Sequence, residues 1–128
     1  MYLSLGIAPI RGLLMKRSYF KSRGERLGPT FLIFGSRCSE EGLFHEEIKQ
    51  FQKDGVLTKT WMCYSREPGK PKEYTGDKLA SDRVKTVLSP YLAKANTHIY
   101  MCGSANMAGE THINVFVHPF FCTLVHSY

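Results

Sequence analysis

The stretch "TFLIFG", residues 30–35, is a short apolar run between turn-forming residues. Gly28 and Pro29 precede it, a pair that marks a turn, and Gly35 opens the polar segment that follows. A short apolar run bounded in this way is typical of a buried strand. We therefore expect residues 30–35 to form a strand that is covered on both faces.

Helix-forming patterns lie on both sides of this run. Residues 8–24 carry a proline near their start and end on a glycine. These residues commonly mark the start and the end of a helix. Residues 39–55 begin with Ser39, a predicted N-cap that is followed by acidic residues. Residues 77–92 carry an apolar stripe at helical spacing. The members of this stripe are Val84, Val87, Leu88, Tyr91 and Leu92.

Two further β-rich runs, residues 56–64 and 98–103, complete an alternation of strands and helices. This rhythm predicts right-handed crossovers and an α/β fold in which a parallel sheet carries helices on both faces. Such sheets bind ligands beyond the carboxyl ends of their strands. The segments expected at those ends are "FGSR", "YSREPGKPKEY" and "CGSANM", so glycines, hydroxyl groups and cations gather on one rim.

The segment "YSREPGKPKEY", residues 64–74, is the most unusual of the three. Its two prolines and its glycine exclude a helix or a central strand, so Arg66, Lys70 and Lys72 must lie on a loop. Cations and hydroxyl groups beside helix N-termini suit a phosphate-bearing ligand. Taken singly, these cations and Arg37 fit ordinary loop surface equally well, so the prediction depends on the rim segments taken together.

The composition is that of one globular domain, with 128 residues, 43% of them hydrophobic and 22% charged. The net charge of +6 arises near the N-terminus, because residues 1–37 hold seven basic residues and a single acid, Glu25. This basic segment predicts an anionic cofactor, an acidic or nucleic-acid partner, or a solvated helix face.

The spacing of cysteine and histidine argues against several kinds of site. The four cysteines form no C-x-x-C pair and the five histidines show no metal-ligand spacing, so we expect neither a metal site nor a disulfide framework. Reduced thiols fit a cytoplasmic location. The sequence has no signal-peptide pattern, and no run approaches the roughly 20 apolar residues that span a bilayer. We therefore expect a cytoplasmic chain without a membrane segment, and a membrane-attached full-length parent stays open as an alternative.

Four motifs, in this order, resemble the NADPH-binding domain of the diflavin reductases: "GIAPIRGLLMKR", "FGSR", "SREPGKPKEY" and "HIYMCGSANM". That family includes NADPH–cytochrome reductase, the reductase half of nitric oxide synthase and the sulfite reductase flavoprotein. The resemblance covers roughly residues 4–110. It implies a three-layer, ferredoxin–NADP reductase-like nucleotide-binding domain, incomplete here, over residues 1–112, with a divergent tail over residues 113–128.

The resemblance implies a role for each matching residue of the cationic loop. Ser65, Arg66, Lys72 and Tyr74 match the residues that hold the adenosine 2′-phosphate, and Tyr74 would also stack on the adenine. A phosphate monoester carries up to about two negative charges, so clustered cations would favour NADPH over NADH. Arg37 matches a residue that contacts the phosphates from the end of a strand.

The resemblance also implies sites for the rest of the dinucleotide. A loop that passes close to the pyrophosphate is matched by Gly6, Ile7, Ala8 and Pro9. Cys102 and Gly103 match the pair beside the nicotinamide, and Met107 completes the implied cofactor-binding set. Cys102 is the implied catalytic residue, because its thiol would help to hold the ring where a hydride passes to the flavin.

The chain departs from the family pattern at both ends. Ser4, Leu5 and Gly6 stand where the family has Gly-Thr-Gly, so the middle hydroxyl is missing. The match fails after Glu110, where the last helix, the final strand and the aromatic residue over the flavin are expected. No FAD-binding or FMN-binding domain precedes the motifs. We therefore interpret the chain as an internal piece of a reductase that is truncated at both ends.

These features predict an NADP(H)-binding module of a flavoprotein oxidoreductase, which positions NADPH for hydride transfer to FAD. FAD and FMN are expected only in the complete parent, whose FAD-binding domain is the expected partner, with no nucleic acid. The isolated chain is expected to be inactive. Two alternatives stay open: a catalytically inactive nucleotide-binding fragment, and a basic module that uses residues 11–26 to bind an acidic partner or nucleic acid.

Overall fold

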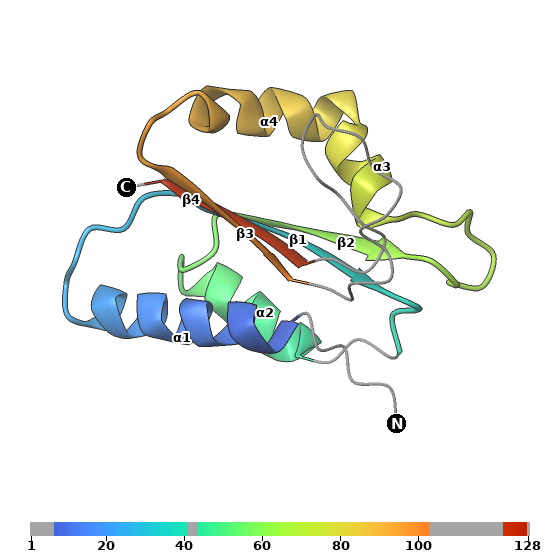
Figure 1. Cartoon of the computed structure of the whole chain (residues 1–128). Helices are drawn as coiled ribbons and strands as arrows, with labels where there is room; N and C mark the ends of the chain where they lie inside the picture. The colour runs from blue at the N-terminus through green and yellow to red at the C-terminus, as the bar shows by residue number, and fades with distance from the viewer. Residues whose placement is uncertain (1–6, 41–43, 103–121, 128) are drawn as a thin grey trace.

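The computed structural model describes residues 7–40, 44–102 and 122–127, which form a sheet with helices on both of its faces (Figure 1). The strands are β1 (Thr30–Ser36), β2 (Lys59–Tyr64), β3 (Thr97–Cys102) and β4 (Cys122–Ser127). Their order across the sheet is β2-β1-β4-β3. The helices are α1 (Ile7–Ser22), α2 (His45–Lys53), α3 (Thr75–Ala80) and α4 (Asp82–Leu92).

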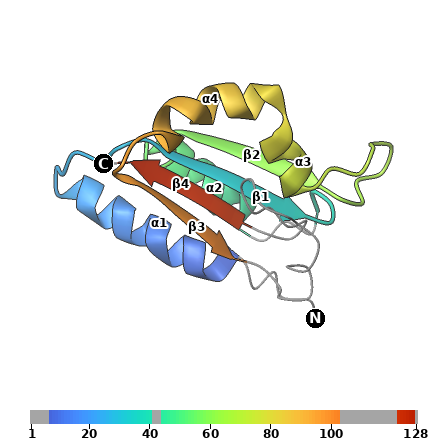
Figure 2. The same cartoon turned by 45° about the horizontal axis from the view of Figure 1, so that its top comes forward.

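Strands β1, β2 and β3 run in one direction, and β4 runs against them. β1 pairs with β2 in parallel, with Ser36 opposite Tyr64 at their carboxyl ends. β4 lies between β1 and β3 and is antiparallel to both, as its reversed arrow shows in Figure 2. The predicted α/β fold with parallel strands and helices is therefore confirmed in outline.

The expectation of a purely parallel sheet is wrong because of β4. This strand belongs to the segment 113–128, for which the family resemblance offered no counterpart. Its sequence, "CTLVHS", contains the β-branched residues Thr123 and Val125, which favour a strand. β4 pairs with β1 on one side and with β3 on the other, so this segment contributes a central strand to the sheet.

Helices α1 and α2 cover one face of the sheet (Figure 1). Ile10 and Leu14 of α1 pack with Ile48 and Phe51 of α2 and with Leu32 of β1. All five side chains are buried. The apolar side chains of α1 and α2 thus bury this face of the sheet.

Helices α3 and α4 cover the opposite face (Figure 1). Val84 and Leu88 of α4 pack against Phe31 and Ile33 of β1 and Trp61 of β2. Successive side chains of a strand point to opposite faces, so the continuous apolar run of β1 supplies both cores. The prediction of a strand buried on both faces at residues 30–35 is confirmed.

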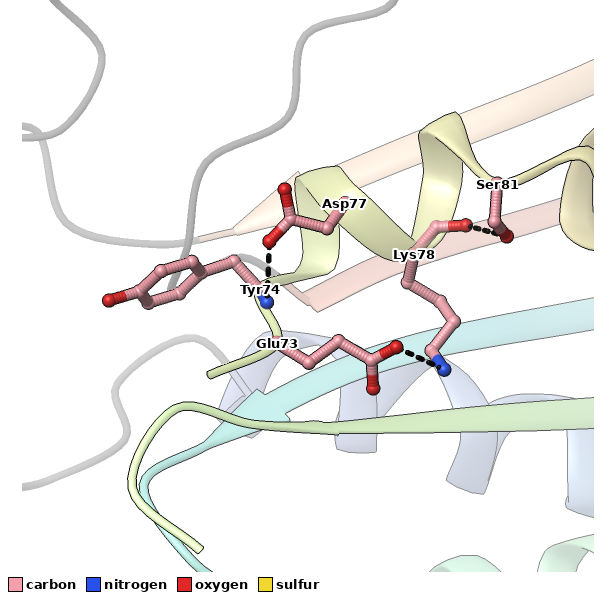
Figure 3. A network of polar contacts seen from close by, with 5 residues as sticks. All are labelled: Glu73, Tyr74, Asp77, Lys78 and Ser81. Atoms are coloured by element: carbon pink, nitrogen blue, oxygen red, sulfur yellow. Dashed lines mark hydrogen bonds and ion pairs between the residues drawn. The ribbon is translucent and has the colours of Figure 1, made fainter. Parts of the chain in front are cut away.

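Two helix predictions need correction. Helix α2 begins at His45 rather than near Ser39, and Phe44 precedes it in the left-handed conformation with φ 65°. Ser39 therefore does not cap α2. The helix predicted over residues 77–92 is two helices, because Ser81 is extended, with φ −66° and ψ 138°, between α3 and α4. The Ser81 hydroxyl donates to the Lys78 carbonyl at 2.6 Å, which ends α3 (Figure 3).

The Cys63 thiol belongs to the core between β2 and α4. Its side chain is 0% exposed, and desolvation, with a smaller contribution from Glu73, raises its pKa from 9.0 to about 12. Because the thiolate is the reactive form, Cys63 is an inert structural thiol at neutral pH. Because the unfolded thiol ionises near pH 9 and the buried thiol does not, this group lowers the stability of the folded state as the pH rises from about 9 toward 12.

We expect Cys63 to resist alkylation by iodoacetamide at pH 8 in the folded protein and to react once the protein is unfolded. Cys38, which is only partly buried, is the internal control and should react first. Peptide mass mapping over time measures each thiol separately. Equal rates for the two thiols in the folded protein would contradict the burial of Cys63.

Within the described residues, no helix is both long enough and apolar enough to cross a membrane.

Candidate functional site

The carboxyl ends of β1 and β2 continue into paired loops. Beyond the strands, the Ser65 N–H donates to the Ser36 carbonyl at 3.1 Å, and the Arg66 N–H donates to the Arg37 carbonyl at 2.6 Å. These bonds continue the backbone contact between the two segments beyond the ends of the strands. They place Arg37 and Arg66, predicted from separate motifs, on neighbouring backbone positions at one rim.

The loop that follows β2 is closed at its base. The Glu73 N–H donates to the Tyr64 carbonyl at 3.0 Å, so the loop of residues 65–72 begins and ends beside the last residue of β2. Inside the loop, the Lys70 N–H donates to the Glu67 carbonyl at 3.2 Å, which forms a turn through Gly69 at φ 73°. A residue with a side chain is strained at such a φ, so glycine suits this turn. The closed base and the turn present the side chains of this loop in a limited set of positions.

The cations of this loop project from it into solvent. Arg66, Lys70 and Lys72 are all exposed, whereas Ser65 at the start of the loop is 5% exposed. The loop thus combines an anchored backbone with exposed positive charge. This combination can attract an anion without a large rearrangement of the backbone.

The exit of the loop is fixed by contacts to α3 (Figure 3). The Glu73 carboxylate pairs with the Lys78 ammonium group at 2.6 Å. The Asp77 carboxylate accepts a hydrogen bond from the Tyr74 N–H at 3.0 Å. The Tyr74 ring, which is half-buried, points away from α3 and from the Glu73–Lys78 pair (Figure 3). The Tyr74 backbone is therefore held by Asp77, while the Tyr74 ring extends on the side away from α3.

The Ser65 hydroxyl is buried and makes no hydrogen bond to the described part of the chain. An unsatisfied buried hydroxyl costs about 1–3 kcal/mol, so such groups call for an explanation. A phosphate oxygen next to Arg66 would accept this hydrogen bond. Because the oxygen atom of the hydroxyl is fully covered, a ligand would reach it only after a neighbouring side chain moves.

Sequence reasoning missed the contact of Glu67 with Ser39. The Glu67 carboxylate accepts hydrogen bonds from the Ser39 N–H at 2.7 Å and from the Ser39 hydroxyl at 2.8 Å. These two bonds, the backbone one first, lower the pKa of Glu67 below its ordinary value. The only available signal was an acid inside a cationic loop, and no local pattern links it to a partner 28 residues away.

The basic side chains of α1 are largely used within the fold. Arg11 pairs with Glu47 of α2 at 2.7 Å. Arg17, which is 7% exposed, donates to the Gly28 carbonyl at 2.6 Å, and Lys21 donates to the Gly55 carbonyl at 3.2 Å. These contacts attach α1 to α2 and to two turns, so Arg11, Arg17 and Lys21 have structural roles.

The remaining predicted residues lie at the same end of the sheet where the structure describes them. Ile7, Ala8 and Pro9 form the first turn of α1, and this end of the helix lies beside the arrow tip of β3 (Figures 1 and 2). Ile7 is buried, whereas Ala8 and Pro9 are exposed. Cys102 is the last residue of β3. Gly6, Gly103 and Met107 lie outside the described residues.

Among residues 7–40, 44–102 and 122–127, no group of three or more histidine, cysteine, aspartate or glutamate side chains could hold a metal ion. The groups described at the candidate site are the cations Arg37, Arg66 and Lys72 and the hydroxyl group of Ser65.

Comparison with known proteins gives a consistent set of relatives. The family model of the oxidoreductase NAD-binding domain matches residues 5–112. Inducible nitric oxide synthase of Gallus gallus is 35% identical over 107 residues, which are 82% of this chain and 9% of that protein. NADPH–cytochrome P450 reductase of Rattus norvegicus is 39% identical over 107 residues, which are 82% of this chain and 15% of that protein.

A bacterial relative has a similar relationship to the chain. Bifunctional cytochrome P450/NADPH–P450 reductase 2 of Bacillus subtilis is 38% identical over 102 residues, which are 79% of this chain and 9% of that protein. The chain thus spans between 9% and 15% of the length of these three relatives.

Proposed function

Because the chain belongs to the family of oxidoreductase NAD-binding domains, we propose that it is an NADP(H)-binding module whose loop 65–74 holds the 2′-phosphate. The resemblance to the diflavin reductases is confirmed by the family match and by relatives of 35–39% identity. The finer fold proposed with this function is the three-layer, ferredoxin–NADP reductase-like nucleotide-binding domain. Its proposed extent is residues 1–112, with residues 113–128 as a divergent segment.

One observation carries the 2′-phosphate assignment: an anchored loop presents exposed cations beside an unsatisfied hydroxyl. Arg66 and Lys72 would supply charge, and Ser65 would donate the hydrogen bond that it does not make within the described chain. Tyr74 would stack on the adenine with the ring that points away from α3 (Figure 3). These residue types fit a phosphate monoester, which NAD(H) lacks at the 2′ position.

The other matching residues have proposed roles along the dinucleotide. Gly6, together with Ile7, Ala8 and Pro9 of the first turn of α1, matches the loop that would pass close to the pyrophosphate, where a helix N-terminus favours an anion. Arg37 would add a charge-assisted bond from the end of β1.

At the nicotinamide end we propose Cys102, Gly103 and Met107 as cofactor-binding residues, with Cys102 as the catalytic residue. Bound NADPH supplies a hydride to a flavin, and the role of the protein is to orient the nicotinamide ring for that step. The position of Cys102 at the carboxyl end of β3 supports this role.

The activity of the whole protein is a proposal that goes beyond this module. Since the chain spans a small part of its relatives, we propose that it acts beside an FAD-binding domain in a parent flavoprotein oxidoreductase. FAD and FMN would be held by that parent, and we expect no bound flavin in the chain alone. We also propose a cytoplasmic location, because the four scattered cysteines of the sequence fit reduced thiols.

We expect NADP⁺ to bind at least about tenfold more tightly than NAD⁺, because one charge-assisted hydrogen bond to the 2′-phosphate contributes about 1.5–3 kcal/mol. Fluorescence titration of Trp61 and the tyrosines with each dinucleotide measures the ratio. A visible spectrum of the same sample reports any bound flavin. Equal affinity for the two dinucleotides would overturn the assignment of the 2′-phosphate to loop 65–74.

The reading as a basic interaction module is not favoured by a specific observation. Arg11, Arg17 and Lys21 have partners within the fold. Binding of a generic polyanion that NADP⁺ does not displace would be the result that revives this reading.

A further inference from the structure

The loops after β1 and β2 are joined by consecutive contacts that lead to one side chain. Ser65 and Arg66 donate their N–H groups to the carbonyls of Ser36 and Arg37. The next residue, Glu67, makes its contact through its carboxylate, which accepts two hydrogen bonds from Ser39. The backbone bonds between the two loops therefore end at Arg66, and the next contact is made by the Glu67 side chain.

The contact of Glu67 fixes the part of the loop that carries the remaining cations. The Glu67 carbonyl accepts the Lys70 N–H at 3.2 Å, so the turn 67–70 starts from a residue whose side chain is tied to Ser39. Among the described residues, the other backbone bonds that hold the loop to its surroundings are those of Ser65, Arg66 and Glu73. Without the contact of Glu67 to Ser39, the segment between Arg66 and Lys72 would sample more conformations.

The charge of Glu67 is unexpected beside a phosphate site. A carboxylate one residue from Arg66 repels a phosphate, so electrostatics alone predicts that removing it strengthens phosphate binding. The two bonds from Ser39 lower the pKa of Glu67 and so favour its charged form. The presence of this carboxylate is explained if its hydrogen bonds to Ser39, by holding the loop, strengthen phosphate binding more than its negative charge weakens it.

We propose that Glu67 is a positioning residue for the 2′-phosphate site, which clamps the loop 65–72 to Ser39 and so holds Arg66 and Lys72 in place for the phosphate. This proposal rests on the proposed function. The clamp spans the two rim segments, and it explains why an acid occurs inside a cationic loop. Glu67 itself does not touch the ligand.

The direction in which one substitution changes the affinity distinguishes a positioning role of Glu67 from a purely electrostatic effect. In Glu67→Ala the clamp and the repulsion are both lost, and we expect the dissociation constant of adenosine 2′,5′-bisphosphate to rise about tenfold, which corresponds to one lost charge-assisted hydrogen bond. Tighter binding by Glu67→Ala would overturn the proposal. Calorimetry at neutral pH and fixed salt concentration is the measurement.

Two further variants control for charge and for shape. Glu67→Gln removes the charge but keeps an oxygen that accepts the Ser39 N–H, so we expect it to retain the wild-type affinity or exceed it. Glu40→Ala removes an exposed acid next to Ser39 without touching the clamp, and it should not weaken binding. A loss in Glu67→Gln as large as that in Glu67→Ala would contradict the clamp.

A second measurement distinguishes failure of the clamp from failure of the proposed function. Trypsin cleaves after Arg66 and after Lys72, so its rate reports how well the loop is held. We expect Glu67→Ala to be cut faster in this loop than Glu67→Gln and the wild type, with unchanged thermal unfolding. If the wild type binds no bisphosphate, the proposed function fails, and unchanged cleavage of Glu67→Ala would independently overturn the clamp.

Discussion

Arg66→Ala is expected to weaken the binding of NADP⁺ by roughly tenfold to a hundredfold and to leave the binding of NAD⁺ nearly unchanged. A charge-assisted hydrogen bond to a phosphate contributes about 1.5–3 kcal/mol, and a guanidinium group can donate more than one such bond. The effect falls on one ligand because NAD⁺ has no 2′-phosphate. The ratio of the two dissociation constants, measured by titration, is the readout.

The structure offers a matched control for this substitution in the same loop. The Arg66 N–H bonds to the Arg37 carbonyl at 2.6 Å through the backbone, so alanine keeps this contact and the loop should retain its path. Lys70→Ala removes the same unit of charge from an exposed side chain without a proposed phosphate contact. We expect it to change the affinity by less than about fivefold. Equal losses in the two variants would indicate a general charge effect instead of a specific contact.

Ile33→Ala is expected to lower the free energy of unfolding by about 2–5 kcal/mol. Ile33 is 1% exposed and lies in β1, which pairs with strands on both sides. Its side chain packs with Val84 and Leu88 of α4, so alanine would leave a cavity between the sheet and that helix. Since domains of this size are stable by only about 5–15 kcal/mol, this is a large share of the total.

Ile99→Ala is the control with the same chemical change at an exposed position. Ile99 lies in β3 at the edge of the sheet and is 44% exposed. The substitution should cost less than about 1 kcal/mol, which is the range of strand propensity. Urea denaturation followed by circular dichroism measures both variants. Equal costs for the two isoleucines would contradict the placement of β1 at the centre of the core.

The central features of the fold could be predicted because they depend on local patterns. The apolar run of β1 is buried on both faces, and short apolar runs between turn residues carry that signal directly. The stripe predicted for residues 77–92 lies entirely within α4, from Val84 to Leu92. It therefore contained no information about residues 77–81, where the chain breaks at Ser81.

The features that could not be predicted depend on contacts between distant residues. Ser39 has the chemistry of an N-cap, but its N–H and hydroxyl bond instead to Glu67, and α2 begins later at His45. The place of β4 between β1 and β3 depends on long-range pairing. In both cases the sequence pattern was compatible with several partners, and tertiary context selected one of them.

The candidate site likewise combines features that local sequence patterns predict with features that depend on distant residues. Proline and glycine in the segment 64–74 predict a cationic loop, and the structure places that loop at the carboxyl end of β2. Its pairing with the loop after β1 follows from the parallel register of the two strands. The burial of the Ser65 hydroxyl follows from neither pattern, because it depends on side chains that the fold brings together.

The most direct test of the central claim is calorimetry of the wild-type chain with adenosine 2′,5′-bisphosphate and with adenosine 5′-phosphate. The two ligands differ by the 2′-phosphate alone, so the comparison isolates the group that Ser65, Arg66 and Lys72 are proposed to hold. We predict that the bisphosphate binds at least about tenfold more tightly, as expected for one charge-assisted hydrogen bond. Equal affinity, or no binding of either ligand, would contradict the account.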